Sequence, residues 1–311
     1  MPSSVVRESA HQSILPFTNV VHAVQFIRKM RGGSQPALIR CNDDKLYIVK
    51  FFNNQQGPNL LANEVLGNEL LNTLNLPTPQ WKAIFISSNF IKENNGMFFE
   101  TPSGSSSINS GLHFGSEFLG GTKTGQVYEW LPNCFSNRVT NREDFLGIYI
   151  FDVWTNHCDN RQSLFATDNG NASFQAVFID NGHLFGGPDW KLRSRCGESL
   201  SLDKRFHPGE WSAKAVEDWI SHFETKFSSS LFDIVQHVPT FWYSGDINQV
   251  AESLIRRLSM LRSLFREELT RERMTFSLPH VEVTDAKLSL HRFELPLHRN
   301  LKGRQASCFA S

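Results

Sequence analysis

The sequence predicts an α+β protein with two lobes, because strand-like segments fill its first half and helical segments fill its second half. Residues 17–131 alternate short apolar stretches, rich in β-branched and aromatic residues, with polar turns, and they contain one helical segment. Residues 132–274 contain longer segments with apolar residues at helical spacing, interrupted by a single hairpin. We therefore expect a β-rich N-lobe followed by a helical C-lobe.

The composition argues against several other classes of protein. With 311 residues, the chain is long enough for two lobes with separate cores. Lys and Arg together number 31, as do Asp and Glu, so no bulk charge favours nucleic acid or membrane binding. No apolar run approaches the roughly 20 residues that span a bilayer, and the N-terminus lacks the apolar stretch of a signal peptide. Five cysteines without a Cys-x-x-Cys pair argue against zinc and disulfides and favour a cytoplasmic protein.

The first elements of the N-lobe follow a polar start. Residues 1–16 are polar, and we expect a disordered lead-in. Residues 17–30 have the composition of a short helix or strand that enters the lobe. Residues 37–41 and 45–52 are rich in β-branched and aromatic residues and are separated by an acidic turn, which predicts a β-hairpin.

The rest of the N-lobe is expected to contain one helix and two further strands. Residues 60–76 have apolar side chains at helical spacing and are followed by two prolines, which stop a helix. Residues 81–87 form the next strand, whereas residues 88–121 are rich in Ser, Asn and Gly and predict a surface insertion. Residues 126–132 are strand-like, and the hinge between the lobes falls near 128–135.

The C-lobe is predicted to be helical with one hairpin. Residues 142–157 are apolar almost all round, which indicates a buried helix, and a polar loop follows at 156–161. Residues 163–180 give a strand, an Asn-Gly turn and a second strand, which predicts a hairpin. Residues 208–274 are mostly helical, and the tail 275–311 has no sustained period.

Several polar residues lie in the order that phosphoryl transfer requires. That reaction uses a glycine-containing loop at the phosphates, a lysine on a strand, an acid on a helix that holds the lysine, and carboxylates for the acceptor hydroxyl and for Mg²⁺. In the N-lobe, these parts correspond to Gly32-Gly33-Ser34 ahead of a strand, Lys50 at a strand end, and Glu64 in the following helix.

The remaining parts come from the hinge and the C-lobe. Glu129-Trp130-Leu131 follows a strand, where backbone groups of a hinge would bind adenine. Asp159 lies in a loop after the buried helix, and Asp180 closes an apolar strand, where a carboxylate is costly unless it is paired or metal-bound. Each feature also has an ordinary explanation, such as a turn, a solvated lysine or a helix-surface acid. The order of the whole set is what favours a site for ATP and Mg²⁺.

Five segments resemble the HipA-like kinase family, in particular its stand-alone bacterial members. They are KLYIVKFF…LLANEVLGNELLNTLNLPTPQW, VYEWLP, FDVWTNHCDNRQSLF, AVFIDNGHLFGGPDW and VPTFWYSGDINQVAESLIRRLSMLR, and the resemblance covers roughly residues 20–270. The two segments that contain Asp159 and Asp180 are the most specific. The resemblance implies a two-lobed protein-kinase-like fold related to the lipid-kinase branch.

The resemblance also implies a role for each candidate residue. Lys50 would bind phosphates and Glu64 would pair with it, while Asp159 would be the catalytic carboxylate and Asp180 would ligate Mg²⁺. Glu129 to Leu131 would form the adenine-binding hinge. Arg161 is expected beside Asp159, where its charge would lower the pKa of that carboxyl group.

The sequence departs from the kinase pattern at one position. Kinases generally place an asparagine five residues after the catalytic aspartate, where it holds a second metal ion, and this chain has Leu164 there. Ser163 or Asn160 would have to take that metal-binding role. Three hypotheses remain open: a kinase for Ser or Thr hydroxyls of an unknown protein substrate, a nucleotide-binding pseudokinase that acts as a regulatory module, and a kinase for a small molecule or lipid.

Overall fold

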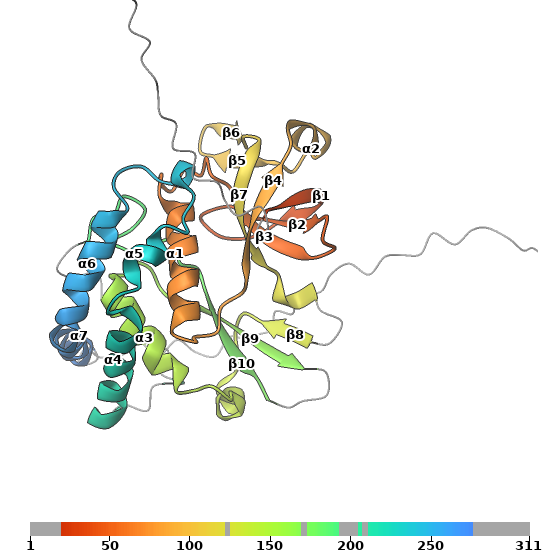
Figure 1. The fold of residues 1–311 in the computed structure, drawn as a ribbon. Coiled ribbons are helices and arrows are strands. Elements are labelled where there is room, and N and C mark those ends of the chain that lie inside the picture. The colour runs from red at the N-terminus through yellow and green to blue at the C-terminus, as the bar shows by residue number, and fades with distance from the viewer. Residues whose placement is uncertain (1–19, 122–124, 169–172, 193–204, 207–210, 276–311) are drawn as a thin grey trace, which may run out of the picture.

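The computed structural model has the predicted α+β architecture, with a strand-rich part and a helical part (Figure 1). It describes residues 20–121, 125–168, 173–192, 205–206 and 211–275. The expected lead-in 1–16 and, apart from Thr275, the expected tail 275–311 lie outside these residues. Within the described residues, no helix is long and apolar enough to cross a membrane.

Five strands of the N-terminal half close into a barrel in the order β1-β2-β3-β7-β4. The strands are β1 (Val20–Lys29), β2 (Ala37–Cys41), β3 (Leu46–Lys50), β4 (Trp81–Ile86) and β7 (Gly111–Glu117). Within the segment 17–30, residues Val20–Lys29 form a strand, and residues 17–19 lie outside the described residues; the predicted hairpin is the antiparallel pair β2–β3. Because β3 ends at Lys50, the barrel presents this lysine at its rim.

The prediction of a surface insertion over residues 88–121 is wrong for its last part. Strand β7 pairs with both β3 and β4 and is central to the barrel, with His113 and Phe114 fully buried. Its glycines suggested a loop, but a Cβ at Gly115 would lie 2.4 Å from the Ile84 side chain, so glycine is required by close packing. The rest of the segment forms helix α2 (Ser88–Glu93) and the hairpin of β5 (Phe98–Thr101) and β6 (Gly104–Ser107).

Helix α1 (Leu60–Thr73) lies between the barrel and the helical part, where it packs against β7 and against α5 (Leu231–Val235) (Figure 1). It is buried on nearly every side, from Leu60 through Leu71. The helix ends at Thr73, earlier than the predicted residue 76, because Asn75 adopts a left-handed conformation with φ 59° ahead of the two prolines. A buried α1 fixes Glu64 relative to both halves of the molecule.

A second sheet of three strands has the order β10-β9-β8. Strands β9 (Gln162–Asp168) and β10 (Gln175–Ile179) form the predicted antiparallel hairpin, whose turn, 169–172, lies outside the described residues. Strand β8 (Gly125–Tyr128) pairs with β9, so the segment before the expected hinge joins this sheet. The sheet carries both loops that contain the predicted catalytic and metal-binding aspartates.

The helices of the second half surround α3 (Asp144–Thr155), which is buried from Phe145 to Thr155 as its apolar sequence predicts. Helices α4, α6 and α7 pack against it. The elements are α4 (Ala213–Phe227), α6 (Asn248–Ser259) and α7 (Leu261–Thr275), with short 3₁₀ turns at Leu119–Gly121, Asn133–Arg138 and Thr240–Trp242. The long helical segment predicted after residue 246 is thus broken at Met260.

Candidate active site

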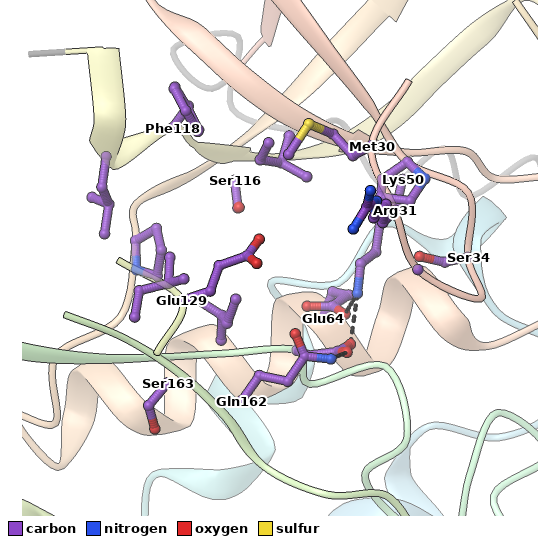
Figure 2. Close-up of a pocket in the computed structure, with 18 of the residues that line it drawn as sticks. Met30, Arg31, Ser34, Lys50, Glu64, Ser116, Phe118, Glu129, Gln162 and Ser163 are labelled. Atoms are coloured by element: carbon purple, nitrogen blue, oxygen red, sulfur yellow. Dashed lines mark hydrogen bonds and ion pairs between the residues drawn. The ribbon is translucent and has the colours of Figure 1, made fainter. Parts of the chain in front are cut away.

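Three predicted residues meet at the boundary between the barrel and the second sheet. The Lys50 amine at the end of β3 donates hydrogen bonds to Glu64 Oε1 of α1 and, over 2.8 Å, to Asp180 Oδ1 after β10 (Figure 2). The side chains of Lys50 and Glu64 are 12% and 4% exposed, and that of Asp180 is 26% exposed. A lysine, a helical acid and a strand-end acid from three distant segments therefore form one ion-pair cluster.

Close backbone packing brings the loop after β10 against α1. A Cβ at Gly67 would lie 2.4 Å from the Asn181 side chain, so only glycine permits this approach. The Asn63 amide donates to the carbonyls of Gly182 and Leu184, and the Asn181 amide N–H donates to Glu64 Oε2 over 3.3 Å. These bonds hold the loop that carries Asp180 against the helix.

The electrostatics of the cluster keep its members charged. Burial alone would raise the pKa of Asp180, but the Lys50 ammonium outweighs burial and lowers it to about 2. Burial also disfavours the charged form of Lys50, yet Glu64 and Asp180 together raise its pKa above the ordinary value. Asp180 takes up a left-handed backbone conformation with φ 66° and accepts a further hydrogen bond from Gln162 Nε2. The metal-binding candidate is therefore an ionised carboxylate held in one orientation.

The Arg161 side chain contacts Asp152 of α3, which differs from the expectation that Arg161 lies against Asp159. Its Nε lies 3.2 and 3.1 Å from the two Asp152 carboxylate oxygens, and its Nη1 donates to Asn181 Oδ1 over 2.8 Å and to the Ile179 carbonyl over 3.0 Å. Burial would raise the pKa of Asp152, but the Arg161 guanidinium outweighs burial and lowers it. Arg161 thus links α3 to the loop that follows β10 and carries Asp180.

Asp159 is exposed and much less constrained than Asp180. Its Oδ1 accepts a hydrogen bond of 2.7 Å from the Asn160 backbone N–H. The loop that carries it begins at Asn156, which ends α3 in a left-handed conformation with φ 56°, and the Cys158 N–H donates to the His183 carbonyl over 3.0 Å. The backbone around Asp159 is held, while its carboxylate faces solvent.

These groups line one cleft of about 690 Å³. The predicted site residues that line it are Gly32, Gly33, Ser34, Lys50, Glu64, Glu129, Asp159, Arg161, Ser163 and Asp180. Figure 2 shows Glu129 and Ser116 facing the same cavity as Lys50 and Glu64. Apolar side chains from both halves complete its walls, among them Ile48, Val127, Leu164, Phe165 and Ile179. A flat apolar ring and a polyphosphate would both find matching surface in such a cleft.

Three predicted residues do not line the cleft. Trp130 is 41% exposed and lies under the Arg205 guanidinium, which sits 5.4 Å from its ring centre. Leu131 is buried, and its carbonyl accepts a hydrogen bond from Arg205. Asn160 is exposed and is not among the residues that line the cavity. Of the hinge candidates, only Glu129 reaches the cavity, and of the candidates for the missing asparagine, only Ser163 does.

Side-chain contacts hold the glycine loop at the mouth of the cleft. Asn54 Nδ2 donates to the Ser34 carbonyl over 2.6 Å, and the Gln35 amide exchanges two hydrogen bonds with the backbone of Glu100. Gly32 has φ 131°, which favours glycine. A Cβ at Gly33 would lie 2.7 Å from the Gln56 amide, so the loop backbone runs close to its neighbour.

The sequence reasoning missed Asp152, Gln162 and Asn181. The signal for Asp152 was available, because an acid inside a helix that is apolar all round must be paired when buried. Asn181 directly follows Asp180, but its side-chain oxygen accepts a hydrogen bond from Arg161, and only the fold brings these two residues together. Nothing in the sequence distinguished Gln162 from a solvated strand residue.

A magnesium ion fits the chemistry of these residues. Among the residues that the structure describes, no group of three or more His, Cys, Asp and Glu side chains is placed to hold a metal by itself. Mg²⁺ prefers oxygen ligands and is commonly held by one or two carboxylates together with substrate phosphates. Asp180 supplies an ionised carboxylate inside the cleft, and Ser163 is among the residues that line the same cavity, with its hydroxyl directed away from Lys50 and Glu64 in Figure 2.

The fold and the cleft together define a kinase-like protein, with a lysine–acid pair between a barrel lobe and a helical lobe. A family model described as HipA-like kinase matches residues 23–179, and the chain belongs to this family. The match includes Lys50, Glu64 and Asp159 and ends one residue before Asp180. No curated protein matches the chain in sequence.

Solved kinase structures resemble the chain at low identity. The Helicobacter pylori proinflammatory kinase CtkA is 12% identical, with a TM-score of 0.46 over 78% of this chain and 95% of that chain. The Golgi casein kinase with bound Mn/ADP is 13% identical, with a TM-score of 0.44 over 82% of this chain and 74% of that chain.

Proposed function

We propose that the chain is an ATP- and Mg²⁺-dependent kinase that phosphorylates a Ser or Thr hydroxyl of a protein. One observation carries the proposal: Lys50 is hydrogen-bonded to both Glu64 and Asp180 in a cleft that the glycine loop also lines. A surface lysine is solvated and gains little from such pairing, whereas this one is buried between two lobes. The arrangement suits a lysine that binds the phosphates of a nucleotide.

The remaining residues have roles that follow from their positions. Asp159 accepts the proton of the acceptor hydroxyl as that oxygen attacks the γ-phosphorus and the bond to the β-phosphate oxygen breaks. Lys50 binds the phosphate oxygens, and the apolar walls around Val127 and Ile179 enclose the base. Mg²⁺, when bound at Asp180, would neutralise charge on the phosphates and hold them in line. Arg161 and Asp152 fix the two loops relative to each other.

The exposure of Asp159 supports a macromolecular acceptor. A hydroxyl on a protein segment can reach a carboxylate that faces solvent, whereas a small enclosed acceptor would need walls around it. Asp159 lines the cleft and is itself exposed to solvent. The same exposure is compatible with a lipid headgroup, so a comparison of acceptors belongs in the test.

A second candidate function, a nucleotide-binding pseudokinase, is favoured by Leu164. Its side chain lines the cleft at the position where an asparagine would hold a second metal ion. An alkyl group cannot ligate a metal, so a protein with this residue would bind nucleotide yet transfer phosphate slowly or not at all. Such a protein would act as a regulatory module.

The test combines a thermal-shift measurement with a transfer assay using radiolabelled ATP. We expect Mg·ATP to raise the melting temperature of the full chain and label to appear on the chain or on a generic protein acceptor. Lys50→Ala should lose both effects, while Lys92→Ala, at an exposed site on α2, should keep them. Stabilisation without any transfer would favour the pseudokinase, and transfer only to lipid would contradict a protein acceptor. A wild-type chain that neither binds nor transfers would overturn the proposal.

A further inference from the structure

The cationic side chains that line the cleft differ in how they are engaged. Lys50 is neutralised by Glu64 and Asp180, and Arg161 is paired with Asp152. Arg205 donates to the Leu131 carbonyl, and its guanidinium lies over aromatic rings. Arg161 and Arg205 therefore have partners within the protein, and the charge of Lys50, which the proposed function assigns to the phosphates, is offset by two carboxylates.

Arg31 is the exception among these lining cations. Its side chain lines the cleft and is exposed, and it makes no hydrogen bond or ion pair with any residue that the structure describes. In the close-up, its guanidinium points into the cavity from the glycine loop (Figure 2). The residue directly precedes Gly32, so it lies in the part of the loop that approaches the phosphates of a nucleotide.

The backbone on either side of Arg31 is fixed. The Met30 N–H donates to the Pro36 carbonyl over 2.8 Å and closes the loop at its base. Ser34 and Gln35 are held by Asn54 and by the backbone of Glu100. Because the backbone is fixed, the Arg31 guanidinium can occupy only a limited region, and because it is unpaired among the described residues it is available to bind an anion there.

We propose that Arg31 binds the γ-phosphate of ATP and stabilises the charge that develops there during transfer. This inference rests on the proposed function. As the acceptor oxygen bonds to the γ-phosphorus, the bond to the bridging oxygen breaks, its electron pair stays on ADP, and the acceptor proton passes to Asp159. The negative charge is then spread over the three equatorial oxygens of the transferred group. The planar guanidinium of Arg31 donates two parallel hydrogen bonds to two of these oxygens.

The composition of the catalytic loop explains why such a cation is needed. Leu164 removes the side chain that would hold a second metal ion, and the Lys50 charge is offset by two carboxylates. A cation from the glycine loop supplies positive charge that no carboxylate among the described residues offsets. The γ-phosphate is the natural partner, because ADP has no group at that position.

The experiment compares ADP and a non-hydrolysable ATP analogue as ligands, each with Mg²⁺, by calorimetry on the full chain. We expect Arg31→Gln to weaken analogue binding about tenfold and ADP binding less than about threefold, because only the analogue carries a γ-phosphate. The affinity of Arg31→Lys for the analogue should lie between those of Arg31→Gln and wild type, since lysine keeps the positive charge but cannot donate two parallel hydrogen bonds. In the transfer assay, Arg31→Gln should lower kcat about 10²-fold. Lys92→Gln removes one positive charge outside the cleft and should change none of these values.

The outcomes separate this inference from the proposed function. If Arg31→Gln binds ADP and the analogue with the same ratio of affinities as wild type, the inference is wrong while the kinase proposal stands. This includes the case in which both affinities fall by the same factor, because a general electrostatic effect does not discriminate the γ-phosphate. A wild-type chain that binds neither nucleotide overturns the kinase proposal and the inference together.

Discussion

The two aspartates of the cleft are embedded very differently. Asp180 accepts hydrogen bonds from Lys50 and Gln162, and its pKa is lowered to about 2 by the Lys50 ammonium against the effect of burial. Asp159 is exposed and accepts a hydrogen bond from the backbone of Asn160. The Asp180 end of the site is therefore fixed by contacts within the protein, whereas the Asp159 end is open to solvent.

Replacing the open carboxylate should have the largest effect on activity and the smallest on stability. We expect Asp159→Ala to lower kcat about 10³-fold or more, because it removes the group that accepts the hydroxyl proton. Mg·ATP binding and the urea midpoint should stay near wild type, since Asp159 makes no ion pair among the described residues. Transfer of radiolabelled phosphate and urea unfolding measure the two effects. Asp189→Ala, at an exposed carboxylate paired with Lys191, is the control. Full transfer by Asp159→Ala would reject this role.

Removing Asp152 should lower the free energy of unfolding, because it breaks a buried ion pair. Its loss leaves the Arg161 guanidinium, whose side chain is 8% exposed, without its carboxylate partner. Removing one member of a buried ion pair costs about 3–5 kcal/mol, so the free energy of unfolding of Asp152→Ala should fall by an amount in that range. Asp218→Ala breaks an exposed pair with Lys214 and should cost less than about 1 kcal/mol. Equal losses of stability in the two variants would show that the Asp152–Arg161 pair stabilises the protein no more than a surface pair does.

The dependence of stability on pH should reveal the ion pair between Asp180 and Lys50. The folded-state pKa of Asp180 is about 2, below the value of about 3.9 for an unfolded chain. Its stabilising effect is therefore complete above about pH 4 and is lost as the pH falls toward about 2. Asp180→Asn should flatten the curve in this window by an amount on the order of 2 kcal/mol. Urea midpoints measured from pH 6 to 2 give the curve, and Asp189→Asn should leave it unchanged. An unaltered slope in Asp180→Asn would contradict the ion pair with Lys50.

The sequence was informative about local elements and least informative about strand β7. The hairpin β2–β3 and the buried helix α3 follow from periodicity, which depends on residues that are neighbours in the chain. Strand β7 contains glycine and histidine because its neighbours Ile84 and Phe52 fill the space around it. From its composition alone such a strand is predicted to be a loop, because packing against residues distant in the sequence determines that composition.

The same limit applied to the site. Lys50, Glu64 and Asp180 could be predicted as a set, because kinase chemistry fixes their order along the chain and the structure brings them together. The partner of Arg161 could not, since Asp152 lies nine residues earlier in the helix and competes with the nearer Asp159. Burial decides that competition: a guanidinium inside the protein gains more from a buried carboxylate than from one in solvent.

The smallest expected effect concerns the residue that replaces the missing asparagine. Ser163 lines the cleft and Asn160 does not, so of the two we expect only Ser163 to contribute to binding of Mg·ATP. We expect Ser163→Ala to weaken Mg·ATP binding about threefold, since a hydroxyl is a weak ligand that water can replace. Asn160→Ala should leave binding unchanged, because its side chain is exposed outside the cavity. Calorimetric titration with Mg·ATP measures both variants against wild type. A larger loss in Asn160→Ala than in Ser163→Ala would mean that the catalytic loop reorganises when nucleotide binds, and the open end would then be shaped by the ligand.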